Sequence, residues 1–176
     1  MKKLIYALFS VVILITCISG CGNSAEDPFT ADNAIKGQVG NLFYTVPENA
    51  VLNASTDDSA MYDIPIDNST EKYTLMIMCK HTNSTDEYED MLRNIDNMKT
   101  QSETETGTTY LTEDINNFLG QPIDKGCKCV GENNGQKITT IIAAGSENVY
   151  MIGYTVKTGF YDQSVWDNFC AQAKLV

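Results

Sequence analysis

The last third of the chain constrains the fold more than any other segment, because it contains three strand candidates joined by turn sequences. The candidates are Ile123–Val130, Gln136–Ala144 and Val149–Lys157. Short apolar runs bounded by Gly, Asn and Ser are typical of strands. Between the first two lies Asn134-Gly135, a pair that favours a tight hairpin because both residues tolerate a positive φ angle. We therefore expect these segments to form an antiparallel meander.

Shorter strand candidates lie upstream and are also bounded by turn residues. They are Leu42–Val46, Val51–Leu52, Met61–Ile64, Tyr73–His81 and Asn116–Leu119. The segment Tyr73–His81 carries apolar residues on both of its faces. We therefore expect it to lie centrally in a sheet, with protein packed on each side.

The apolar pattern changes to a helical period in two places. Ser84 and Glu87 have the spacing of a capping box and predict a helix over about Thr85–Lys99, with one apolar and one acidic face. Asp162 or Ser164 can cap a second helix near the end of the chain. The apolar stripe of that helix is Val165, Trp166, Phe169, Cys170 and Ala173.

One domain accounts for most of the chain, since 176 residues leave room for a single core. The strands and helices predict an α+β domain over residues 36–176, with a single antiparallel sheet and a mid-chain and a C-terminal helix packed on it. Residues 101–114, rich in Thr and Glu, are expected to form a loop or a poorly ordered edge of the sheet. The net charge of −11, from 23 acidic and 12 basic residues, excludes a nucleic-acid-binding domain with a basic stripe.

The first twenty residues have the order of a secretory signal. Two lysines at positions 2 and 3 precede the apolar run Leu4–Ile18, which is too short for a comfortable membrane span. The sequence Ile18-Ser19-Gly20-Cys21 then resembles the lipobox of bacterial lipoproteins. The resemblance implies cleavage before Cys21 and lipidation of its sulfur, as with palmitate. Cys17 is the competing position, but it follows Thr16 and fits the lipobox less well.

This resemblance implies a protein held to the extracytoplasmic face of the cell membrane by acyl chains on Cys21. Residues 1–20 would be the signal peptide, and residues 21–35, which are small, polar and acidic, would form a flexible tether. Two acyl chains anchor a protein durably, because each buried methylene contributes about 0.8 kcal/mol.

The layout of the domain loosely resembles the PsbP-like fold, which occurs in photosystem extrinsic proteins and in small bacterial lipoproteins. The shared features are a strand ending in a proline turn at Phe43–Pro47, a mid-chain helix, a Gly-Gln-Pro step at Gly120–Pro122, the three-stranded meander, and a closing helix that ends in Lys174-Leu175-Val176. That family is functionally diverse, so the resemblance concerns architecture.

Four cysteines lie in the domain: Cys79, Cys127, Cys129 and Cys170. If two disulfides form, Cys79 and Cys170 would each pair with one of the other two, since Cys127 and Cys129 share a strand face where an unstrained mutual bridge is difficult. A single bridge is equally compatible with the sequence. Buried free thiols are the remaining alternative.

A metal site is a further interpretation of the same residues. Cys79 and His81 share one strand face, as do Cys127 and Cys129, so neighbouring strands could present three sulfurs and one imidazole to a tetrahedral zinc ion. Met76 and Met78 would point away from Cys79 and His81, which argues against a copper site with those two residues and favours core methionines.

The residues offer little for catalysis. His81 is the single imidazole, so a nucleophile that needs a histidine base must use it. Ser146 lacks the second glycine of a nucleophile elbow. We therefore expect no enzyme and no cofactor, but a non-enzymatic binding or accessory module of the cell envelope with an unidentified partner, bound through loops or an exposed sheet edge. The alternatives are a metal-binding or thiol redox-sensing lipoprotein and, least favoured, a small cysteine hydrolase.

Overall fold

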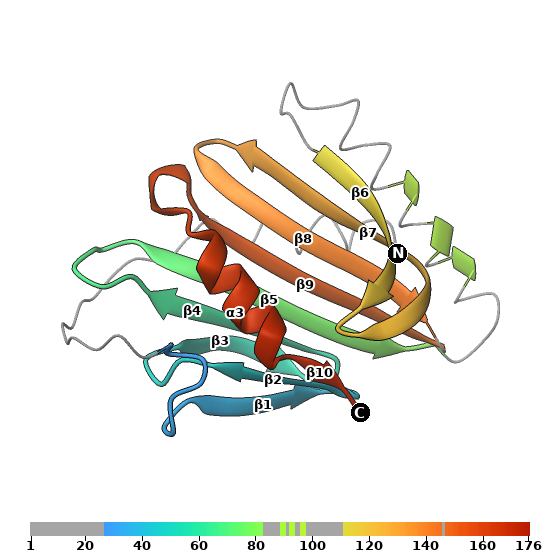
Figure 1. Cartoon of the computed structure of the whole chain (residues 1–176), viewed down its shortest axis with the longest axis horizontal. Helices are drawn as coiled ribbons and strands as arrows, with labels where there is room; N and C mark the ends of the chain where they lie inside the picture. The colour runs from blue at the N-terminus through green and yellow to red at the C-terminus, as the bar shows by residue number, and fades with distance from the viewer. Residues whose placement is uncertain (1–26, 83–88, 91, 94–95, 98–110, 146) are drawn as a thin grey trace.

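The computed structural model describes residues 27–82, 89–90, 92–93, 96–97, 111–145 and 147–176. These residues form two antiparallel sheets, one short 3-10 helix and a C-terminal α-helix (Figure 1). The elements are β1 (Ile35–Val39), β2 (Leu42–Val46), β3 (Val51–Thr56), β4 (Ser59–Pro65), β5 (Lys72–His81), β6 (Leu111–Phe118), β7 (Gln121–Asn133), β8 (Gln136–Gly145), β9 (Asn148–Lys157), η2 (Thr158–Phe160), α3 (Gln163–Gln172) and β10 (Lys174–Leu175).

The larger sheet has seven strands in the order β3-β4-β5-β9-β8-β7-β6. The expected meander is confirmed as β7, β8 and β9, and its first turn places Asn134 at φ 50° and Gly135 at φ 72°. Strand β5 lies inside the sheet, between β4 and β9, as the apolar residues on both of its faces predict.

The smaller sheet has three strands in the order β1-β2-β10. Strands β1 and β2 form a hairpin that turns at Gly40, whose φ is +56°, and Ile35 pairs with Val46 at the open end. Strand β10 pairs with the other edge of β2, so that Lys174 lies opposite Phe43. Segments at opposite ends of the domain therefore meet in one sheet.

The prediction of an α+β domain with a single sheet is wrong, because the chain is mostly β and divides its strands between two sheets. An apolar pattern identifies β2 as a strand but does not say which strands will pair with it. The partners of β2 are β1, where the sequence predicts no strand, and β10, two residues that the sequence predicts as the end of the closing helix.

The mid-chain helix is only partly covered by the described residues. Residues 89–90, 92–93 and 96–97 are helical, whereas the remaining positions of the predicted helix lie outside the described residues. Of residues 101–114, expected to form a loop or a poorly ordered edge, the last four belong to β6, an edge strand of the larger sheet, and the others lie outside the described residues.

Helix α3 and the smaller sheet together cover one face of the larger sheet (Figure 1). The helix begins after Asp162, whose Oδ1 accepts a hydrogen bond from the Ser164 backbone N–H at 2.8 Å, which confirms Asp162 as the cap. Its apolar side buries Trp166 and Phe169. Trp166 lies over Tyr154 of β9 with a centroid separation of 6.0 Å, so this part of the core is largely aromatic.

The opposite face of the larger sheet has a second, smaller core. Its buried residues are Cys127, Ile142, Ala144, Val149 and Met151, and Met76, Met78, Leu92 and Cys129 pack against them. Leu92 is one of the helical residues in the middle of the chain, and neighbouring Asp96 forms an ion pair with Lys125 of β7. These contacts cover the second face of β5, whose residues Met76 and Met78 are apolar.

The packed domain includes residues before β1. Phe29 lies in the segment predicted as a tether, and its side chain is buried at 2% exposure against Phe169 of α3. None of the helices in the described part of the chain is both long and apolar enough to cross a membrane.

Candidate functional site

Strand β3 forms one edge of the larger sheet, and no described strand pairs with its outer side. All six of its residues are exposed, including the apolar Val51 at 56% and Leu52 at 50%. The register against β4 shifts between Leu52 and Ala54, so the strand carries a bulge near its middle. The strand has no charged side chain, although two aspartates follow it in the turn to β4.

Most exposed edges are protected by charges or proline, because a row of unpaired backbone groups can pair with another chain. The opposite edge, β6, follows that pattern, since Glu113 and Asp114 lie at its centre. On β3 the bulge is the only such protection among the six residues. The sequence predicts a strand at Val51–Leu52 and binding at an exposed sheet edge in general, but it does not place this strand at the edge.

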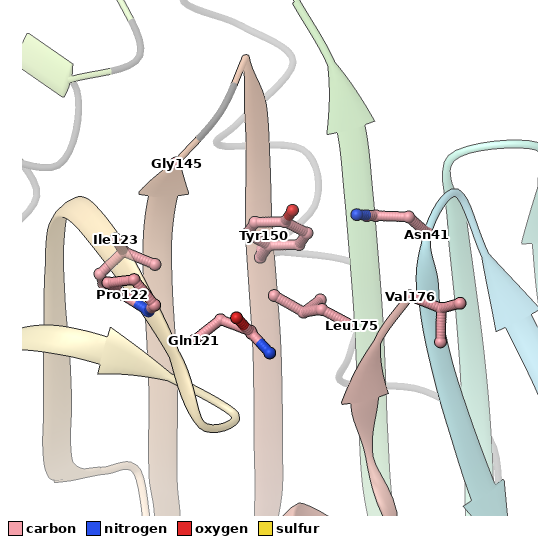
Figure 2. A pocket seen from close by; sticks show the side chains of 8 residues that line it. All are labelled: Asn41, Gln121, Pro122, Ile123, Gly145, Tyr150, Leu175 and Val176. Carbon is pink, nitrogen blue, oxygen red and sulfur yellow. The ribbon is translucent and has the colours of Figure 1, made fainter.

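A pocket of about 370 Å³ lies where the smaller sheet meets the larger one (Figure 2). Its lining comes from the β1-β2 turn, the start of β7, the β8-β9 connection and the end of the chain, and comprises Asn41, Gln121, Pro122, Ile123, Gly145, Tyr150, Leu175 and Val176. We call it the Tyr150 pocket. Figure 2 shows the Tyr150 ring between Ile123 and Asn41, with the Gln121 amide and the Leu175 side chain below it.

Polar contacts fix the walls of the Tyr150 pocket. The Cys79 thiol donates to the Asn41 Oδ1 at 3.1 Å, and the side chains of Asn41 and Asn148 hydrogen-bond to the Tyr150 hydroxyl. His81 joins the far end of this network, with its Nδ1 3.3 Å from the Asn148 Oδ1. The Tyr150 ring stacks on Phe118 with centroids 5.2 Å apart.

Burial keeps the two acidic groups of this network protonated at neutral pH. It raises the pKa of the Tyr150 hydroxyl, against the opposing effect of the hydrogen bonds from Asn41 and Asn148. It also raises the pKa of the Cys79 thiol, against hydrogen bonds from the backbone N–H groups of Asn41 and Leu42. The pocket therefore offers hydrogen bonds and apolar contacts to a small molecule, and Cys79 is a weak nucleophile. Sequence reasoning missed Asn41 and Gln121, since turn and strand-end amides carry no distinguishing pattern.

The structure separates the cysteines into two groups. Cys79 lies on the face of the larger sheet that packs against the smaller sheet and α3, and Cys170 lies in α3 itself. Cys127 and Cys129 lie on the opposite face, with their Sγ atoms 3.9 Å apart. A bridge from either residue of the first group to either of the second would have to cross the sheet.

The four residues considered for zinc are likewise not brought together. Cys79 and His81 are on β5, and two strands, β9 and β8, separate β5 from the β7 strand of Cys127 and Cys129. Within the described part of the chain, no group of three or more His, Cys, Asp or Glu side chains is placed to hold a metal ion. Cys21 and Ser146 lie outside the described residues.

The thiol of Cys170 is also a poor nucleophile. Burial, together with the neighbouring Asp167 carboxylate, raises its pKa to about 12, although Lys128 acts in the opposite direction.

Comparisons with known proteins find loose structural likenesses. No protein-family model matches the sequence, and no curated protein matches it. The chain is similar to a Pseudomonas aeruginosa protein of unknown function, described as a proposed regulator, at 12% identity and a TM-score of 0.48, over 82% of this chain and 96% of that chain. It is similar to cyanobacterial PsbP from Synechocystis at 8% identity and a TM-score of 0.48, over 89% and 98% of the two chains.

A Bacteroides thetaiotaomicron protein is similar over 77% of this chain and 45% of that chain, at 12% identity and a TM-score of 0.39. Because all three TM-scores are below 0.5, we take no fold, ligand, partner or activity from these likenesses.

Proposed function

We propose that this chain is a membrane-anchored extracytoplasmic lipoprotein, and that its non-enzymatic domain binds an extended segment of another envelope protein along β3. The single observation that supports binding at this position is the exposure of all six residues of β3 at the edge of the larger sheet. A segment that pairs with such an edge gains backbone hydrogen bonds along its whole length, and its alternate side chains provide the specificity.

The composition of β3 defines the chemistry of the partner. Val51 and Leu52 offer exposed apolar surface, and the strand carries no charge that would repel or misalign an incoming chain. Asp57 and Asp58 lie in the turn at the end of the strand. The best partner is therefore an extended segment with small apolar side chains and a lysine or arginine that reaches these two carboxylates.

A lysine in the middle of β3 tests this proposal. In Leu52→Lys we expect crosslinking from a photoreactive residue at position 55 to fall by at least about tenfold, or about 1.4 kcal/mol of binding free energy, because the charge obstructs pairing. The measurement is crosslinking in the native cell, followed by mass spectrometry that maps the crosslinked segment. A synthetic peptide of that segment should then slow amide hydrogen exchange in β3.

The matched control for this experiment is Leu111→Lys, which places the same charge on the opposite edge at a side chain that is 69% exposed. It should leave the crosslinks unchanged. Equal crosslinking from the Leu52→Lys protein, or stronger crosslinking of the same partner from a photoreactive residue placed beside the Tyr150 pocket than from position 55, would contradict binding along β3.

The lipid anchor rests on the lipobox resemblance at Cys21 and has its own test. We expect Cys21→Ala to abolish labelling of the protein by a clickable fatty acid, because the sulfur that carries the acyl chain is gone. Cys17→Ala is the matched control and should be labelled like the unchanged chain. Fatty-acid label that persists in the Cys21→Ala protein would contradict the anchor.

A further inference from the structure

The second core gathers sulfur on the face of the larger sheet that lies opposite α3. Two thiols and three thioethers belong to it: Cys127, Cys129, Met76, Met78 and Met151. The alternation of residues along β5 points Met76 and Met78 away from Cys79, which argues against a copper site that combines them with Cys79 and His81. The structure places Met76 and Met78 on the same face as the other two cysteines.

The strand register shows how these side chains align across the sheet. Met78 lies opposite Met151, Met151 opposite Ile142, and Ile142 opposite Cys127. These four residues form one row across β5, β9, β8 and β7. Cys129 lies in the next row on this face, two residues further along β7.

The backbone holds the two thiols at a set spacing. Strand β7 is paired on both sides, with β8 over Lys125–Asn133 and with β6 at Cys127 and Cys129. Residues two apart in such a strand have Cα atoms about 6.8 Å apart. That separation lies at the upper limit for a disulfide, which requires sulfur atoms about 2.05 Å apart. The two ladders oppose the contraction that a Cys127–Cys129 disulfide would need.

The observed spacing suits one metal ion between the sulfurs. The two Sγ atoms are 3.9 Å apart. Two thiolates that bind one ion at about 2.3 Å each have sulfur atoms about 3.8 Å apart when the S–metal–S angle is tetrahedral, and about 4.6 Å apart when the ion has only these two ligands and the angle is linear. The pair can therefore bind such an ion with small side-chain rotations, whereas a disulfide requires the sheet to deform.

We propose that Cys127 and Cys129 bind one Cu(I) ion through their thiolates, on a face of the sheet where Met151 and Met78 continue the row of Cys127 beyond Ile142. Soft thiolate and thioether ligands favour Cu(I), zinc and iron–sulfur clusters over harder metal ions. Structural zinc requires four ligands. Asp114 of β6 lies opposite Cys127, but within the described residues no group of three or more His, Cys, Asp or Glu side chains is placed to hold a metal ion. Cu(I) accepts two or three ligands, so the pair is sufficient for it.

Binding replaces two S–H bonds with two Cu–S bonds and releases two protons, and no electron is transferred. The site then carries one negative charge in total. The nearest charges along the strand register have opposite signs. Lys125 lies two residues from Cys127 on β7 and is paired with Asp96, whereas Asp114 of β6 lies opposite Cys127. Cys129 is half-buried and Cys127 is 1% exposed, so the ion enters through Cys129.

The test uses the full chain in detergent, reduced and without oxygen, carrying Cys17→Ser and Cys21→Ser to remove the thiols of the leader. Cu(I) is added in competition with a chromophoric Cu(I) chelator. We expect one tightly held ion per chain and an X-ray absorption spectrum with only sulfur in the first shell. Cys129→Ala should lose that ion, whereas Cys79→Ala and Cys170→Ala should retain it.

Circular dichroism checks that each variant remains folded. Cys129 is half-buried, so Cys129→Ala should preserve the sheet, whereas Cys127→Ser changes a buried residue and can prevent folding. Copper that the chelator removes completely, or copper that remains in a folded Cys129→Ala protein, would overturn the proposal. It would also be overturned if the pair took up zinc that Cu(I) does not displace. Formation of a Cys127–Cys129 disulfide with a small disulfide reagent, without Cu(I) binding, would assign the pair to thiol exchange instead.

Discussion

Phe169→Ala should lower the free energy of unfolding by about 3–5 kcal/mol, the cost of removing a buried phenyl ring and leaving a cavity. The ring is 1% exposed and lies where three parts of the domain meet. Its centroid is 6.3 Å from that of Phe29, which precedes β1, and 6.5 Å from that of Tyr44 on β2. The change therefore weakens the contact of α3 with both the smaller sheet and the start of the domain.

Urea unfolding followed by circular dichroism measures this loss, and the midpoint of thermal unfolding should fall by about 10 °C or more. Phe160→Ala is the matched control. Its ring is 37% exposed at the end of η2, so the free energy of unfolding should change by less than about 0.5 kcal/mol. Equal losses from the two variants would show that Phe169 does not join these elements as described.

Gly40→Ala should destabilise the protein by about 2–4 kcal/mol, from backbone strain and overpacking together. Gly40 has a φ of +56°, in the left-handed region that favours glycine. A Cβ atom there would lie 2.6 Å from the Cys79 Sγ and 3.3 Å from the Cys79 carbonyl oxygen. The β1-β2 turn would have to move away from β5, and the contact between the sheets would loosen.

The control for this variant is Gly159→Ala, where a Cβ atom meets nothing within 4 Å and the φ is not in the left-handed region. Chemical denaturation should find it neutral, or more stable by about 0.4–1 kcal/mol because the unfolded chain loses freedom. In Gly40→Ala, Cys79 should also react faster with a maleimide than in the unchanged chain. An unchanged unfolding midpoint and an unchanged rate would contradict the close approach of the turn to β5.

Local patterns in the sequence predicted individual elements well. The turn at Asn134-Gly135 and the cap at Asp162 are short-range features, and both are confirmed. The partition into two sheets was not predictable in this way, because it depends on pairing between residues about 130 positions apart, as with Phe43 and Lys174. The two-residue strand β10 is also too short to carry any period of its own.

The candidate sites likewise include features that a local pattern predicts and features that depend on the strand order of the whole sheet. Alternation along β5 predicted that Cys79 and the two neighbouring methionines point to opposite faces, and the structure agrees. It did not reveal that Met76 and Met78 face the β7 cysteines, since that requires the strand order of the whole sheet. The exposed edge of β3 also depends on strand order, which no local pattern contains.

The position of β10 has a consequence for the order of folding. Strands β1 and β2 form early in synthesis, but their sheet remains a bare hairpin until residues 174 and 175 pair with β2. A two-stranded hairpin is marginally stable by itself. The aromatic face of the larger sheet, which this sheet and α3 cover, therefore stays open until almost the whole domain has been made. A chain exported before residues 174 and 175 pair with β2 would cross the membrane without its complete smaller sheet, and this pairing would complete the fold on the far side.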